Sequence, residues 1–136
     1  MPHISGYHHV SLPAGDVLRT GDWYERVFGF ARVLIEEDED HVTAVMLEHP
    51  AGIILYLHHA PEQLEAWRGS VARAPVIGFR VNSYDELRSW EASLPLLSVE
   101  HSALRQAHVG WALDVIDPDG LRIQLHTSEP VSTDGI

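Results

Sequence analysis

The sequence predicts an α+β fold made of two βαβββ modules, and two observations support this prediction. The first is a repeated turn and strand: residues 49–58 (HPAGIILYLH) and 117–126 (DPDGLRIQLH) carry Pro, Gly, Leu and His at four matching positions. The second is that each repeat forms the end of a series of expected elements in the same order: a strand, a helix and further strands. We therefore expect the two modules to form a curved mixed sheet with a central cavity.

The second repeat opens with a tight turn. Pro118 fixes φ at the first turn position, the aspartates on either side can bond their own backbone, and Gly120 can adopt a positive φ. The strand that follows places three side chains on its polar face: Arg122, Gln124 and His126. In the first repeat, Tyr56 stands at the position of Gln124 and His58 at that of His126. This paired polar face is a candidate site.

The first module is predicted over residues 7–60. It begins with a strand at 7–14, in which His9 and Ser11 face away from the apolar side. A helix follows, which Asp16 caps and Gly29 ends, and its expected apolar stripe consists of Leu18, Trp23, Val27 and Phe28. Three further strands are expected at 31–37, 42–48 and 53–58, with the acidic residues from Glu36 to Asp40 explained by solvation around a turn.

A linker is predicted over residues 61–74, with a short helix that begins at Pro61, and the second module over residues 75–127. Its first strand is 76–81. Ser83 and Glu86 have the spacing of a capping box and open a helix with an apolar stripe of Leu87, Trp90 and Leu94. Strands are expected at 97–101, 111–116 and 121–126, and a flexible tail at 128–136. The whole chain, 1–136, is expected to be one domain.

Composition excludes several classes of function. With no cysteine, the chain has no disulfide or thiolate, and any metal would need His, carboxylate or amide ligands. A formal charge of -11 argues against nucleic-acid and membrane partners and favours a neutral or cationic small ligand. No apolar run is long enough to span a membrane, and no secretion signal is seen at the start, so we expect a cytoplasmic protein.

Three motifs, HHVSLPAGD, WYERVFGF and DPDGLRIQL, occur in this order within the duplicated pattern. With them, the chain from Tyr7 to His126 resembles the vicinal oxygen chelate superfamily, which includes glyoxalases, bleomycin-resistance proteins and extradiol dioxygenases. The resemblance implies a small-molecule ligand and a homodimer, either swapped or unswapped. Fold alone does not assign a function.

The resemblance also implies metal ligands on the first and last strands of each module. His9 keeps the first ligand type, whereas Val76, at the matching position of the second module, cannot ligate. Tyr56 and Gln124 stand at the two last-strand positions. Gln124 is the second candidate ligand, after His9, for one divalent ion: Zn, Ni, Mn or Fe. Without a carboxylate the charge of the ion is uncompensated. Alternatively, His58 and His126 converge with His9 into a site of three imidazoles.

The residues expected to bind a ligand lie on the polar strand faces or at a strand start: Tyr56, His58, Arg80, Trp111 and His126. Trp111 would stack on the ligand and Arg80 would pair with its charge. A loop at residues 102–110 is a candidate lid. No nucleophile elbow or phosphate loop is found, so no catalytic residue is assigned and the question of enzymatic activity is left open.

These observations favour a glyoxalase/bleomycin-resistance-like protein that binds a small organic ligand in the cavity between the modules, with a degenerate metal site. The alternative is a metal-dependent lyase, isomerase or dioxygenase, in which a divalent ion at His9 and Gln124 polarises a bidentate oxygen substrate. A third hypothesis is a structural or regulatory dimer without a ligand.

Overall fold

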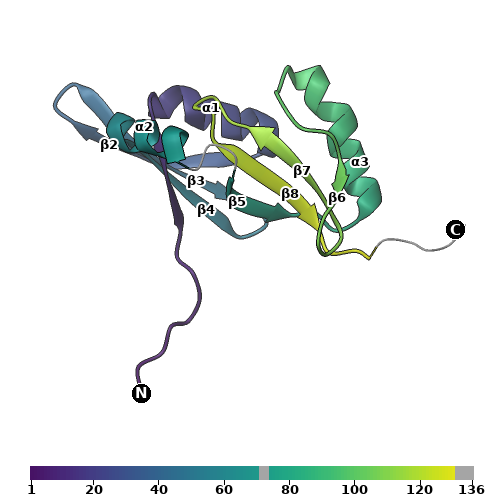
Figure 1. The fold of residues 1–136 in the computed structure, drawn as a ribbon. Helices are drawn as coiled ribbons and strands as arrows, with labels where there is room; N and C mark the ends of the chain where they lie inside the picture. The colour runs from purple at the N-terminus through teal and green to yellow at the C-terminus, as the bar shows by residue number, and fades with distance from the viewer. Residues whose placement is uncertain (71–73, 131–136) are drawn as a thin grey trace, which may run out of the picture. The chain divides into compact units, whose positions relative to one another are not determined.

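A computed structural model describes residues 1–70 and 74–130 of the chain (Figure 1). The chain divides into two compact units, Met1–Ala66 and Trp67–Ile136, and each is described by itself. No helix in the described ranges is long and apolar enough to cross a membrane. The elements of the first unit, followed by the helix that bridges the division, are β1 (Val10–Ala14), α1 (Val17–Phe28), β2 (Ala31–Asp38), β3 (His41–His49), β4 (Ile53–His59) and α2 (Pro61–Ser70).

The first unit contains a four-stranded mixed sheet with the order β1-β4-β3-β2. β1 runs parallel to β4, and the other neighbours are antiparallel. Helix α1 packs on one face of this sheet: a Cβ added to Gly21 would lie 3.4 Å from Val45 and 4.0 Å from Leu47. Alternation brings further buried side chains to this face, namely Leu12, Leu55 and Leu57. The opposite face carries the polar positions.

Helix α1 begins and ends where the sequence predicts. The Asp16 side chain accepts a 3.1 Å hydrogen bond from the Arg19 N–H, and Gly29 ends the helix with a φ of 82°. The predicted apolar stripe is wrong at Leu18, which is exposed, whereas Trp23 is buried. At 100° per residue, the five steps between them turn the helix by about 140°, so the two side chains point in different directions.

The second unit repeats the plan. Its elements are β5 (Pro75–Arg80), α3 (Tyr84–Ser93), the 3-10 helix η1 (Leu94–Leu97), β6 (Arg105–Gln106), β7 (Trp111–Ile116) and β8 (Arg122–Thr127). The sheet order is β5-β8-β7-β6, with β5 parallel to β8. Ser83 caps α3 by accepting from the Glu86 N–H at 3.1 Å. The α+β fold with two βαβββ modules, each with a four-stranded mixed sheet, is confirmed.

The predicted strand at 97–101 is wrong. Residues 94–97 form η1, which has Pro95 in its first turn and ends at Ser98 with a φ of 57°. His101 makes only an isolated bridge to Val115, and the edge strand is the two-residue β6. A proline lacks the N–H that a strand ladder needs and favours the first turn of a helix, which moves the edge strand further along the chain.

The ends of two predicted segments lie outside the described residues. The linker helix is observed as α2 up to Ser70, and residues 71–73 of the predicted linker are not described. In the predicted tail, residues 128–130 are exposed, and 131–136 are not described.

The two repeated turns have matching backbone geometry. Gly120 and Gly52 both have a φ of 86°, and each donates a hydrogen bond from its N–H to the carbonyl three residues earlier. In the second turn the Asp117 carboxylate also accepts from the N–H groups of Asp119 and Leu121, at 2.9 Å each. In the first turn His49 takes this role, since its Nδ1 accepts from Ala51 at 2.9 Å. The duplicated turn is therefore maintained with different side chains.

Candidate functional site

The face of the first sheet opposite α1, here called the module-one face, carries a row of side chains across all four strands. In the register of the sheet, Ser11 pairs with Tyr56, Tyr56 with Met46, and Met46 with Leu34. The adjacent row contains His58, Ala44 and Glu36. Because paired residues in a sheet share a face, these polar and apolar side chains form one continuous surface.

Tyr56 lies at the centre of the module-one face. Its hydroxyl donates a 2.5 Å hydrogen bond to Oε2 of Glu36. This hydrogen bond raises the pKa of the Tyr56 phenol, and burial and the Glu36 charge raise it further. Tyr56 is therefore a neutral hydroxyl held beside a carboxylate. It is not a phenolate.

Two imidazoles flank Tyr56. The His9 ring centroid lies 5.8 Å from that of Tyr56, and the His58 ring stacks on the other side at 6.2 Å. Nδ1 of His9 lies 2.9 Å from Nδ1 of His8. His58 Nε2 lies 3.1 Å from Oε1 of Gln63, which makes Nε2 the donor. Nδ1 of His58 is buried and has no hydrogen-bond partner among the residues described.

The face of the second sheet opposite α3, here called the module-two face, carries three of the predicted residues. Gln124 pairs with Gly78 on one side and Asp114 on the other. His126 pairs with Arg80 and with Ala112 in the same way. Gln124, His126 and Arg80 therefore share one face, as the alternation of the strand predicts.

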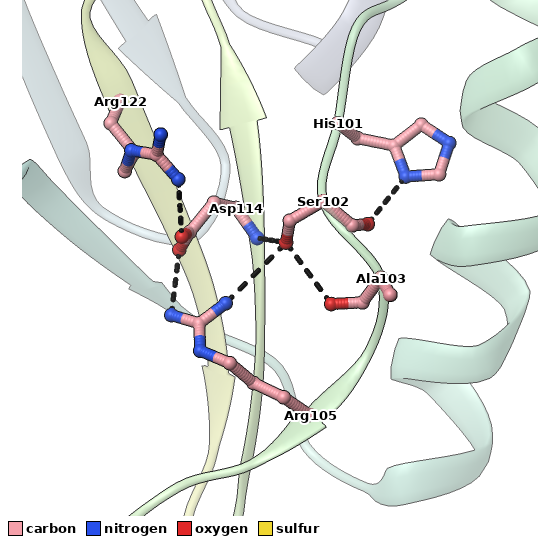
Figure 2. A network of polar contacts seen from close by, with 6 residues as sticks. All are labelled: His101, Ser102, Ala103, Arg105, Asp114 and Arg122. Atoms are coloured by element: carbon pink, nitrogen blue, oxygen red, sulfur yellow. Dashed lines mark hydrogen bonds and ion pairs between the residues drawn. The ribbon is translucent and has the colours of Figure 1, made fainter. Parts of the chain in front are cut away.

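A cluster around Asp114 connects three segments of the second unit (Figure 2). The Asp114 side chain is only 6% exposed, and its two oxygens accept from Arg105 at 3.0 Å and from Arg122 at 2.9 Å. Its backbone N–H donates to the Ser102 hydroxyl at 2.9 Å. Burial by itself raises the pKa of Asp114, but the hydrogen bonds and charges of the two guanidiniums outweigh it and hold the pKa below its usual value.

Within the second unit, Trp111 lies on the opposite sheet face from Arg80 and His126, the other ligand-binding residues predicted there. Trp111 pairs with Thr127, one position out of phase with His126, and its ring lies 4.8 Å from that of Tyr84 at the start of α3. It therefore faces the helix, and Gln124 and His126 face away from it. His9, Tyr56 and His58 are brought together in the first unit.

Sequence reasoning missed the hydrogen-bonding roles of five residues. Four lie on the sheet faces, namely Glu36, Arg105, Asp114 and Arg122, and Gln63 reaches His58 from α2. Glu36 belongs to β2 and bonds Tyr56, so its interpretation as a solvated turn residue is wrong. For Asp114 a signal was present: an aspartate in the middle of the strand WALDVI is a carboxylate expected to need a partner.

The donors on each face do not fit a divalent ion. On the module-one face, the position of the expected carboxylate holds a protonated phenol that donates to Glu36. On the module-two face it holds the amide of Gln124, and the neighbouring carboxylate of Asp114 is engaged by two arginines. Within the described parts of the chain, no three His, Asp or Glu side chains are grouped so that they could hold a metal ion. Taken by itself, neither face therefore groups enough ligands among the residues described to hold a divalent ion.

The chain has the architecture of a protein built from two copies of a βαβββ module, each with a polar sheet face opposite its helix. The sequence model of the Glyoxalase/Bleomycin resistance protein/Dioxygenase superfamily matches residues 6–125, and the chain belongs to this superfamily. No curated protein sequence matches the chain.

Solved structures share the fold at low sequence identity. A glyoxylase/bleomycin resistance protein/dioxygenase domain from Frankia sp. EAN1pec has a TM-score of 0.71 at 18% identity, covering 98% of this chain and 96% of that one. A fosfomycin resistance protein from Listeria monocytogenes has 0.69 at 18%, covering 92% and 94%. An antibiotic binding protein from Streptomyces sp. CB03234 has 0.66 at 17%, covering 92% and 98%. These similarities show the fold.

Proposed function

We propose that the chain is a binding protein for a small organic molecule, which contacts the module-one face around Tyr56. The observation that carries this proposal is the hydrogen bond from Tyr56 to Glu36, at the position where the family resemblance implies a metal-binding carboxylate. A neutral hydroxyl there, with imidazoles at 5.8 Å and 6.2 Å, offers hydrogen bonds and ring contacts without a metal.

The surroundings of Tyr56 support an aromatic or amphipathic ligand. Leu34 and Met46 continue its row with apolar side chains, and a thioether adapts to ligands of different shape. The His58 ring, stacked on Tyr56 at 6.2 Å, adds aromatic surface beside the phenol. The antibiotic-binding relative supports the same class of function for this fold.

Titration of chelator-treated protein tests the proposal. We expect saturable binding of at least one member of a panel of aromatic antibiotics that includes bleomycin, with the ligand recovered chemically unchanged by mass spectrometry. Tyr56→Phe removes one hydroxyl and should weaken binding by about tenfold. Tyr84→Phe is the matched control, because Tyr84 packs against Trp111 in the second unit. Binding that disappears on chelation and returns with added metal, or no binding at all, would contradict the proposal.

One observation favours the alternative, a metal-dependent lyase, isomerase or dioxygenase: His9 keeps the ligand type at its first-strand position and lies beside Tyr56. Elemental analysis of protein purified without a His tag tests this alternative. It requires near-stoichiometric Zn, Ni, Mn or Fe that is lost in His9→Ala and kept in His41→Ala, whose side chain lies at the exposed start of β3. We expect no such difference under the binding proposal.

We also propose that the chain forms a homodimer. β2 is an edge strand of its sheet, and three successive apolar residues in it are about half exposed, namely Val33, Leu34 and Ile35. An exposed apolar edge strand is commonly covered by another chain, and closed symmetric dimers are the commonest assembly.

A further inference from the structure

The module-two face carries positive charge in a strongly acidic chain. The protein has nine basic residues and a formal charge of -11. The four strands of the second sheet nevertheless contain three arginines, Arg80, Arg105 and Arg122, and one acidic residue, Asp114. Register and hydrogen bonds place all four on the same face. The net charge of the chain therefore does not describe this surface, whose strands have an excess of two positive charges.

Asp114 holds two guanidiniums with one carboxylate. Each of its oxygens accepts from one arginine, at 3.0 Å from Arg105 and 2.9 Å from Arg122 (Figure 2). A carboxylate neutralises one of these charges, so the cluster keeps one unit of positive charge. The Asp114 side chain is buried, whereas the arginine side chains are 43% and 27% exposed, so both can reach a molecule from solvent.

The two guanidiniums retain hydrogen-bond donors. A guanidinium has five N–H donors, and Arg122 uses Nη1 to donate to Oδ2 of Asp114 at 2.9 Å. Nη1 of Arg105 makes only a long contact of 3.4 Å with the Ser102 hydroxyl. Paired guanidiniums with fixed direction and excess charge suit an oxyanion, which they bind through charge-assisted hydrogen bonds.

We propose that Arg105 and Arg122 form a binding site for a small-molecule oxyanion, either a phosphate-type group or a carboxylate. Asp114 acts as the positioning residue that holds the two guanidiniums. This inference goes beyond the proposed function at the module-one face, since it assigns a second binding site to the module-two face and names the chemical class of its ligand. An anionic ligand differs from the neutral or cationic ligand that the net charge of the sequence favours. The reason is that charge is unevenly distributed over the surface of the protein.

Anion titration of the intact chain tests the proposal at constant ionic strength. The probes are inorganic phosphate and benzoate, followed by NMR chemical shifts with sodium chloride as the reference salt. We expect saturable binding of at least one probe, and the preferred probe identifies which oxyanion the site takes. Arg122→Gln should weaken that binding by about tenfold or more, whereas Arg19→Gln, on α1 of the first unit, should leave it unchanged.

Asp114→Asn separates ligand binding from a purely structural role in tying β6 to β7. If the arginines form an anion site, the variant should bind the probe several-fold more tightly, because its side-chain amide keeps one acceptor oxygen to position a guanidinium but carries no negative charge to repel the anion. Arg122→Lys keeps the charge but loses the planar fork, and provides a second variant if Arg122→Gln does not fold. No saturable binding of either probe, or equal binding by wild type and both Arg122 variants, would overturn the proposal.

The anion test and the test at Tyr56 can fail separately. If the inference about the arginines is wrong, ligand binding that depends on Tyr56 persists while phosphate and benzoate fail to bind. If the proposed function is wrong, the antibiotic panel fails in chelated protein whatever the anion titration shows.

Discussion

Tyr56 and Glu36 are joined by a 2.5 Å hydrogen bond across the sheet, although β3 separates their strands. The bond links the edge strand β2 to the central strand β4 and fixes the phenol in the middle of a face that also carries His9 and His58. The family resemblance implies a metal-binding carboxylate at position 56. The Tyr56 hydroxyl, a hydrogen-bond donor, stands there instead, and Glu36 of β2 supplies a carboxylate beside it.

The Tyr56 phenol should ionise only above its ordinary pKa of about 10, because Glu36 raises its folded-state pKa. The stability it contributes is therefore fully present below about pH 10 and lost as the pH rises through the higher folded-state value. Spectrophotometric titration of wild type against Tyr56→Phe assigns the transition. Glu36→Gln should lower this pKa, and Glu48→Gln, on the same face but not bonded to Tyr56, should not. An unchanged titration in Glu36→Gln would refute the assignment.

Asp114 should make stability depend on pH at the acid end. Its folded pKa is lowered, so its contribution is present above the unfolded value of about 3.9 and lost as the pH falls through the folded value. Asp114→Asn should cost about 1–3 kcal/mol near pH 7 and flatten the acid limb of the stability curve. Chemical denaturation across pH measures this, with Asp40→Asn in an exposed turn as the control. Parallel curves for wild type and Asp114→Asn would contradict it.

Gly110 should tolerate no side chain. Its φ is 76°, and a Cβ would collide with the backbone carbonyl oxygen of Thr127. We expect Gly110→Ala to lower the free energy of unfolding by about 2–4 kcal/mol. Gly78→Ala is the matched control, because a Cβ there meets nothing within 4 Å, and it should change stability by less than about 1 kcal/mol. Equal melting temperatures for the two variants would show that the turn at Gly110 adapts.

If β2 forms the dimer contact, Leu34→Lys should shift the chain from dimer to monomer in light scattering coupled to size-exclusion chromatography. Leu34 is 47% exposed on the edge strand, and a buried lysine in an interface is costly. Leu96→Lys is the control, because Leu96 is 85% exposed in η1 of the second unit and belongs to no strand. If the wild type is a monomer, or if the dimer persists in Leu34→Lys, the proposed role of β2 in dimerisation is wrong.

The sequence by itself determined the local structure. The caps at Asp16 and Ser83, the turns that end in Gly52 and Gly120, and the alternation along β4 and β8 follow from interactions within a few residues. The internal repeat and the family resemblance predicted two βαβββ modules, which the structure confirms. Asp114 was also within reach of sequence reasoning, since an aspartate inside an apolar strand is expected to need a partner.

Only the tertiary structure decided which distant side chains meet. β2 contains register shifts between Arg32 and Leu34 and between Glu36 and Glu37. Plain alternation would put Arg32 and Glu36 on one face, but the first shift turns Arg32 toward Asp22 and Glu25 of α1 and leaves Glu36 to meet Tyr56. A bulge of one residue reverses which face each later side chain takes, and it depends on the pairing between strands, so the local sequence does not reveal it.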